Sequence, residues 1–172
     1  MKITINPEQL TVDDTWQIFR KVRAIIENEK GFIAISMEGG KVIFPGGKCD
    51  QNESETDAII RETTEETGID FSNSKFTKLF ELETIYGNYY DYRTDSKKTR
   101  YTKTTYYYVK TSYNIDESNM NLTEGELKEN FKIKFVSRKK LEEMIFKDHS
   151  NMENGKYFDE ENIIVFNKVL KK

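Results

Sequence analysis

Residues 47–69 read GKCDQNESETDAIIRETTEETGI, a loop that begins with glycine and runs into a helix. Ser54 followed by Asp57 matches an N-terminal capping pattern. Gly68 stands where many helices end in a left-handed residue. These signals predict a helix over residues 54–67.

Three glutamates of this helix are predicted to share one face. Glu62, Glu65 and Glu66 are spaced i, i+3 and i+4 and fall within about 100° of arc. Like charges at this spacing disfavour the helix, and so does the negative end of its dipole. A hard cation such as Mg²⁺ reverses that effect, because carboxylates are its preferred protein ligands. The face indicates a metal site, with a solvated acidic surface as the alternative.

The spacing around these glutamates resembles the Nudix box at every charged and glycine position. The matching residues, in order, are Gly47, Glu53, Arg61, Glu62, Glu65, Glu66, Gly68 and Ile69. One position departs from the pattern, because Thr63 replaces an apolar residue. A threonine can still face the core if its hydroxyl bonds back to a helix carbonyl. We call residues 47–69 the box.

The resemblance implies an α/β fold, the Nudix-type α/β/α sandwich with a mixed central sheet. It also implies hydrolysis of the pyrophosphate bond in a nucleoside diphosphate linked to another moiety, with Mg²⁺ or Mn²⁺ as cofactor. Candidate substrates are ADP-ribose, nucleotide sugars, nucleoside triphosphates, dinucleoside polyphosphates and RNA 5′ ends, and the sequence does not choose among them. The alternative is a nucleotide-sensing or regulatory module that keeps the fold without turnover.

The resemblance also assigns roles to individual residues. It implies that the metal ligands are the Gly46 carbonyl and the carboxylates of Glu62, Glu65 and Glu66. Arg61 is expected to orient the neighbouring carboxylates, and Glu53 to support the helix.

The general base is expected either in the box, at Glu62, or in a loop outside it. Three glutamates precede the predicted strand 132–136, namely Glu124, Glu126 and Glu129. We favour Glu126, and an ordinary solvated loop is the alternative.

Arginines outside the box are candidates for binding substrate. Arg23 lies on a predicted strand, and Arg93 and Arg100 flank a charged loop. We expect Arg23 and Arg100 to contact substrate phosphates, with solvated arginines as the alternative.

The rest of the chain predicts one domain over residues 1–172. Alternating apolar residues predict a hairpin over 22–35, a strand over 41–44, and long strands over 78–92 and 101–113. The tyrosines of the long strands are expected to pack the sheet rather than stack a base. Helices are predicted over 137–146 and from a cap at Asp159. The termini resemble nothing specific, and they are candidates for homodimer contacts or substrate choice.

The composition excludes several classes of protein. One cysteine, Cys49, and one histidine, His149, cannot build a disulfide framework or a zinc site of Cys and His ligands. No apolar run approaches the length of about 18 residues that a membrane span needs, and residues 1–8 hold no apolar segment of signal-peptide length. We therefore expect a soluble cytoplasmic protein. The net charge of −3 offers no basic field for nucleic acid, so a small molecule is the expected partner.

Overall fold

A computed structural model describes the chain except residues 14–15, 38–39, 92–93, 129 and 172. In the described part of the chain, seven strands form one mixed sheet, in the order β1-β5-β6-β2-β3-β4, with β7 paired to β3. The strands are β1 (Lys2–Ile5), β2 (Ile18–Asn28), β3 (Gly31–Ser36), β4 (Val42–Ile43), β5 (Thr77–Asp91), β6 (Ser96–Lys110) and β7 (Lys132–Val136). β2 runs parallel to β6 and β1 parallel to β5, whereas the other pairs are antiparallel.

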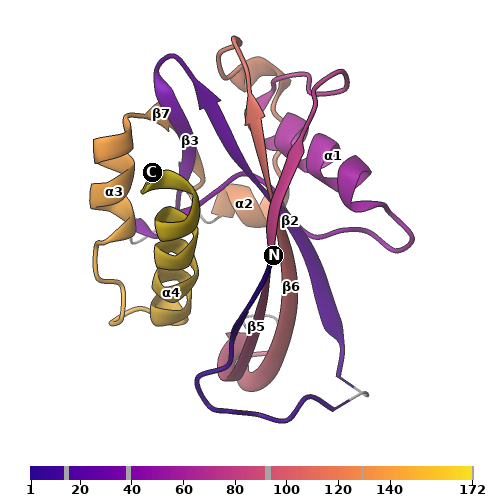
Figure 1. Cartoon of the computed structure of the whole chain (residues 1–172), viewed down its shortest axis with the longest axis vertical. Coiled ribbons are helices and arrows are strands. Elements are labelled where there is room, and N and C mark those ends of the chain that lie inside the picture. The colour runs from indigo at the N-terminus through magenta and orange to yellow at the C-terminus, as the bar shows by residue number, and fades with distance from the viewer. Residues whose placement is uncertain (14–15, 38–39, 92–93, 129, 172) are drawn as a thin grey trace.

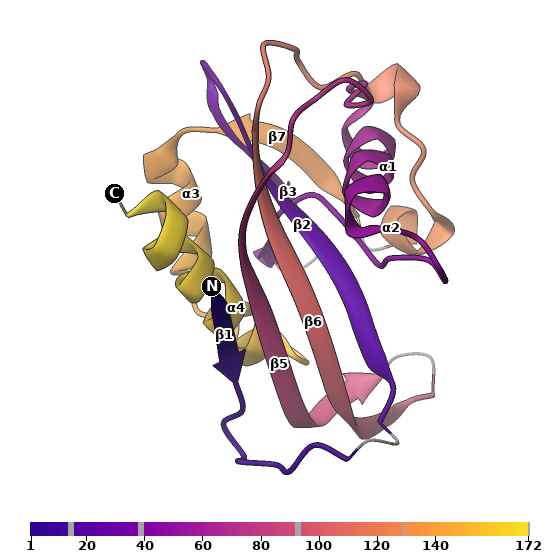
Figure 2. The ribbon, with the colours of Figure 1, turned by 45° about the vertical axis from the view of Figure 1, so that its right-hand side comes forward.

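Helices cover both faces of this sheet, as Figures 1 and 2 show. α1 (Glu55–Thr67) packs on one face. α3 (Arg138–Ile145), α4 (Gly155–Val165) and the π-helical turn Phe166–Leu170 pack on the other. Two separate groups of buried apolar side chains result, one on each side of the sheet. The predicted α/β/α sandwich with a mixed sheet is confirmed.

The predicted helix of the box is confirmed with both of its ends. The Ser54 hydroxyl accepts a hydrogen bond from the backbone N–H of Asp57 at 3.1 Å. Gly68 ends the helix with φ of 68°. Thr63 is fully buried, and its hydroxyl donates to the Ile59 carbonyl at 2.5 Å. The one departure from the box pattern is therefore absorbed inside the helix.

The loop that enters the box is held against β2. β2 and β3 pair only next to their turn, through Glu27–Phe32 and Asn28–Gly31. Farther along, the loop takes the place of β3 beside β2. The Val22 N–H donates to the Gly47 carbonyl at 2.9 Å, and the Ala24 N–H donates to the Pro45 carbonyl at 2.7 Å. These bonds fix the loop glycines at the edge of α1.

The last helix does not begin where the sequence predicted. α4 starts at Gly155 after Asn154, and the predicted cap at Asp159 is wrong. The Asp159 carboxylate instead accepts from the backbone N–H of His149 at 2.9 Å and lies 2.6 Å from His149 Nδ1. Because the Asp159 carboxylate binds His149, ten residues earlier in the sequence, it does not cap a helix at its own position.

Other boundaries also differ from the prediction. β2 begins at Ile18, because residues 18–27 all pair with β6. β6 begins at Ser96, because Asp91 and Ser96 close an antiparallel ribbon with β5. The segment around Glu126 is a short helix, α2 (Glu124–Lys128), preceded by the 3₁₀ turn η2 (Glu117–Asn119). No described helix is long and apolar enough to cross a membrane.

The placement of the loop makes a prediction about Gly46. Its φ is +129°, and a Cβ there would collide with the Val22 carbonyl. We expect Gly46→Ala to lower the free energy of unfolding by about 2 kcal/mol or more. Gly125→Ala is the control, because its Cβ has no neighbour closer than 3.8 Å. Urea unfolding of both variants checks this, and equal stability of the two would contradict the described loop.

Candidate active site

Arg61 binds three carboxylates of the box at once. Its Nε and Nη2 donate to the two oxygens of Glu53, at 2.8 and 2.9 Å. Its Nη1 lies 2.9 Å from Glu62 Oε1 and 3.3 Å from Glu65 Oε2. A planar guanidinium suits this arrangement, because its donors point in fixed directions. One arginine therefore sets the positions of carboxylates on both the loop and the helix.

Glu66 is the most deeply buried acid of the box, with 2% of its surface exposed. Its Oε2 accepts a hydrogen bond from the Gly46 N–H at 2.6 Å. Burial raises the pKa of Glu66 to about 8, and the nearby charges of Glu126 and Glu62 add to the rise. Arg23 and the Gly46 N–H oppose the rise without cancelling it. A carboxylate in this position is stabilised by a nearby cation.

Both backbone polar groups of Gly46 form hydrogen bonds. Its N–H binds Glu66, and its carbonyl accepts from Nη1 of Arg23. The same Arg23 nitrogen donates to the Phe44 carbonyl at 2.9 Å. In this structure Arg23 therefore holds the loop. The Gly46 carbonyl, which we predict to bind the metal, accepts a hydrogen bond from Arg23.

The carboxylates that we predict to bind the metal do not converge on one point in this structure. Within the described residues, no three Asp, Glu, His or Cys side chains converge so as to hold a metal ion. Glu62 and Glu65 turn toward Arg61, and Glu66 turns toward the loop. The donor set nonetheless fits a hard divalent cation, because Glu66 and Glu62 are carboxylates whose pKa values are both raised, primarily by burial. A cation would have to draw Glu62 and Glu65 partly away from Arg61.

Glu126 lies at the same cavity as Glu66. This cavity of about 400 Å³ is lined by Gly46, Gly47, Glu66 and Glu126, among others. The Glu126 carboxylate accepts from the backbone N–H of Thr123 at 2.7 Å, so it also caps its own helix. Glu124 does not line the cavity, and Glu129 lies outside the described residues.

Arg100 also reaches this cavity, from β6. Its guanidinium carbon lies 4.7 Å from the ring centroid of Phe19 and 4.4 Å from that of Tyr89. Cation–π contacts with two rings restrain the position of this group. Arg93, the other arginine of the predicted loop, lies outside the described residues.

Sequence reasoning missed a charged chamber between the sheet and α4. Lys21, Arg23, Arg100 and Glu161 all line it, together with tyrosines of the sheet and α4. Burial lowers the pKa of Lys21, and the positive charges of Arg23 and Arg100 lower it further. Lys21 could have been predicted from the sequence, because it lies two residues before Arg23 and therefore on the same face of the strand. Glu161 could not, because its place on the chamber wall depends on how α4 packs against the sheet, which leaves no local pattern in the sequence.

The predicted role of the tyrosines agrees with their burial. Tyr86, Tyr101, Tyr106 and Tyr107 are all at least 93% buried in the sheet. Tyr86 stacks on Tyr157 of α4, with ring centroids 3.9 Å apart. Cys49 is buried and unpaired.

Comparison with known families decides the class of the protein. A family model described as the NUDIX domain matches residues 18–155, which include the whole box. The chain belongs to the Nudix family. Members of this family are in general pyrophosphohydrolases of nucleoside diphosphate derivatives, and the chain is an enzyme of this class. Comparison with curated proteins gives no significant match.

Solved structures share this fold at low sequence identity. The MutT protein from Methanosarcina mazei Go1 is 20% identical, with a TM-score of 0.53 over 93% of this chain and 100% of that one. The E. coli ORF135 protein is 14% identical, with a TM-score of 0.52 over 94% and 99%. The E. coli dihydroneopterin triphosphate pyrophosphohydrolase is 13% identical, with a TM-score of 0.53 over 85% and 95%. These likenesses support the Nudix fold.

The contacts of Arg61 predict a measurable coupling with Glu53. The pair is bidentate, and Glu53 is only 14% exposed, whereas Lys140 and Glu143 form a surface pair that is 57% and 52% exposed. In double-mutant cycles without metal, we expect a coupling of about 1–2 kcal/mol for Arg61→Gln with Glu53→Gln. The surface pair should give about 0.5 kcal/mol or less. Equal couplings in urea unfolding would show that Arg61 does not organise the box.

Proposed function

We propose that this Nudix protein hydrolyses the pyrophosphate bond of a nucleoside phosphate with Mg²⁺ or Mn²⁺ as cofactor. The observation that carries this proposal is the buried carboxylate of Glu66, at the wall of an open cavity and with a raised pKa. A surface acid would be solvated, whereas this one gains from a cation at the cavity. The spacing of the box supports the same ligand set.

Each residue has a distinct task in the proposed reaction. Glu62, Glu65 and Glu66, with the Gly46 carbonyl, would hold the metal. When bound, the metal neutralises phosphate charge and polarises the bond to be broken. Arg61 keeps Glu62 and Glu65 oriented, and its bond to Glu53 ties the helix to the loop.

Two groups would act on the substrate from outside the box helix. Glu126 lies at the cavity and is proposed to accept the proton of the attacking water. Arg100 is proposed to bind a phosphate oxygen, because its guanidinium is restrained by cation–π contacts with two rings and lines the cavity. The unpaired, buried thiol of Cys49 supports our proposal of a cytoplasmic location.

A direct assay tests the proposed function. The purified protein is incubated with Mg²⁺ or Mn²⁺ and a panel of ADP-ribose, nucleotide sugars, nucleoside triphosphates and dinucleoside polyphosphates, and the products are separated. Hydrolysis that requires the metal supports the proposal. Binding of panel members without hydrolysis of any would instead favour the nucleotide-sensing module.

Glu66→Gln should abolish most of this turnover. The variant keeps the size of the side chain but loses one anionic ligand. We expect kcat to fall about 100-fold or more, because even outer partners of metal ligands contribute 10- to 100-fold. Steady-state kinetics across a Mg²⁺ titration measure the loss. Near-native turnover of Glu66→Gln would overturn the assignment of the box as the catalytic metal site.

Glu126→Gln should act on chemistry without acting on metal binding. If Glu126 is the base, kcat should fall about 100-fold or more while the Mg²⁺ concentration for half-maximal rate changes little. Glu124→Gln is the matched control, since Glu124 belongs to the same short helix but does not line the cavity. Its turnover should stay within about twofold of the native value. Native turnover of Glu126→Gln would leave Glu62, Glu124 or Glu129 as the candidate base.

A further inference from the structure

We propose that a groove beside the box cavity binds the nucleobase of the substrate by stacking on Trp16. This inference rests on the proposed function, since the base belongs to the nucleoside phosphate that is hydrolysed at the box. The ligand class is a purine or pyrimidine nucleotide, with its phosphates at the box and its base in the groove.

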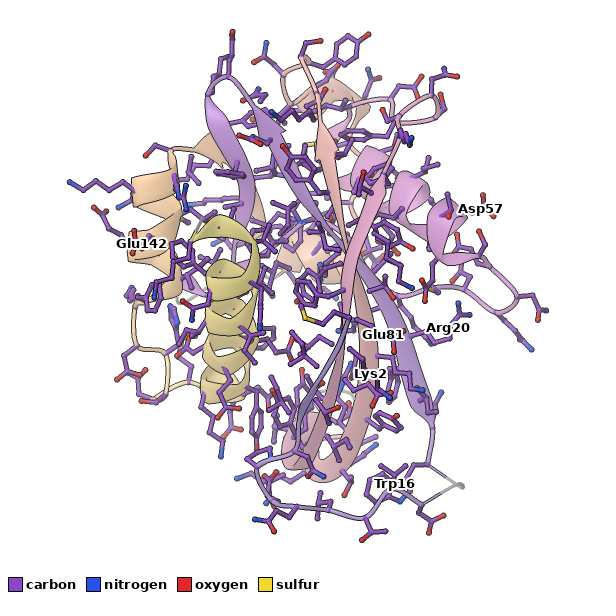
Figure 3. All side chains as sticks on the ribbon, in the orientation of Figure 1. Lys2, Trp16, Arg20, Asp57, Glu81 and Glu142 are labelled. Atoms are coloured by element: carbon purple, nitrogen blue, oxygen red, sulfur yellow. The ribbon has the colours of Figure 1, made fainter. Side chains whose placement is uncertain are left out.

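The groove lies between the start of β2 and the end of the β5–β6 ribbon. It encloses about 490 Å³, and Trp16, Gln17, Tyr89, Thr94 and Thr99 are among its walls. Phe19, Lys48, Asp91 and Arg100 line both the groove and the box cavity. One ligand can therefore extend from the box into the groove. Figure 3 shows Trp16 at the end of the molecule where the connection from β1 reaches β2.

The side chain of Trp16 has no partner among the described residues. The indole is partly buried at the groove wall, but no hydrogen bond, ring contact or cation contact joins it to the rest of the described chain. Its backbone N–H alone is bonded, to the Asp13 carbonyl at 2.9 Å. An aromatic face on a groove wall is a surface on which any nucleobase can stack.

Two cations stand where the groove joins the box cavity. Arg100 is held between Phe19 and Tyr89, and its N–H groups have no acceptor in the described part of the chain. The Lys48 ammonium lies 5.9 Å from the Phe19 ring centroid and pairs with no described carboxylate. Lys98, in contrast, is paired with Asp91 at 2.8 Å. Phosphates that connect a base in the groove to the metal site would pass Arg100 and Lys48.

The charged chamber beneath α4 is too small to receive the base instead. Its open volume is about 40 Å³, against about 490 Å³ for the groove. Such a volume holds only a few water molecules. A planar base could enter only if α4 separated from the sheet, where Tyr157 stacks on Tyr86. The groove is the space that already fits a base.

Fluorescence gives a test that does not depend on turnover. Trp16 is the only tryptophan of the chain, so intrinsic emission reports on this position alone. The protein with Mg²⁺ is titrated with the α,β-methylene analogues of ATP and GTP, and with methylenediphosphonate as the base-free control. We expect the nucleotide analogues to quench Trp16 saturably and the control to leave it unchanged. Equal responses to analogues and control, or no response at all, would overturn the proposal.

Kinetics on the best substrate of the panel give the second test. We expect Trp16→Ala to raise KM by about 5- to 150-fold, the range of one base stack, with kcat within about twofold. Trp16→Phe should recover most of the affinity, because phenylalanine also offers a stacking face. Tyr113→Ala is the control, since Tyr113 is 67% exposed and lies outside the groove. Its KM should equal the native value.

The outcomes separate this inference from the proposed function. Native KM in Trp16→Ala, or a raised KM only in Thr102→Val on the chamber wall, would overturn the groove as the base site. Quenching of Trp16 by the analogues without hydrolysis of any panel compound would support the groove and contradict the proposed enzyme reaction.

Discussion

The site depends on the close approach of the Gly46 peptide to β2 and to Glu66. Without a side chain at Gly46, the loop lies against the Val22 carbonyl, and the Gly46 N–H reaches the Glu66 carboxylate. The partial separation of β2 and β3 creates the gap that the loop fills. This arrangement brings a helix face, a loop carbonyl and the cavity together. A side chain at Gly46 would push the loop away from all three.

Electrostatics explains why the carboxylates of the box need positively charged partners. Arg61 neutralises part of the acidic face through Glu53, Glu62 and Glu65. It does not reach Glu66, whose pKa is raised by burial. The loop N–H is a weak substitute for a full positive charge. We propose that a divalent cation at the cavity is the partner that completes this balance.

The sequence predicted the parts of the fold that depend on neighbouring residues. The ends of the box helix follow from Ser54 and Gly68, and its acidic face from a spacing of three and four residues. The sequence did not predict the features of the fold that depend on long-range contacts. Asp159 looked like a helix cap but binds His149, and the helix begins instead at Gly155, after Asn154, whose φ is 58°. The pairing of the loop with β2 depends on contacts between residues that are distant in the sequence. The same is true of the groove wall at Trp16 and of the chamber wall at Glu161. None of these features leaves a local pattern in the sequence.

The melting temperature with and without metal tests the central claim most directly, because it asks whether the acidic face binds a cation. The native protein is compared with the Glu65→Gln, Glu66→Gln double variant, each with and without millimolar Mg²⁺ or Mn²⁺. We predict that metal raises the melting temperature of the native protein and not that of the variant. If metal leaves the native protein unchanged, while the double substitution raises the melting temperature equally in both conditions, the acidic face is only a solvated surface.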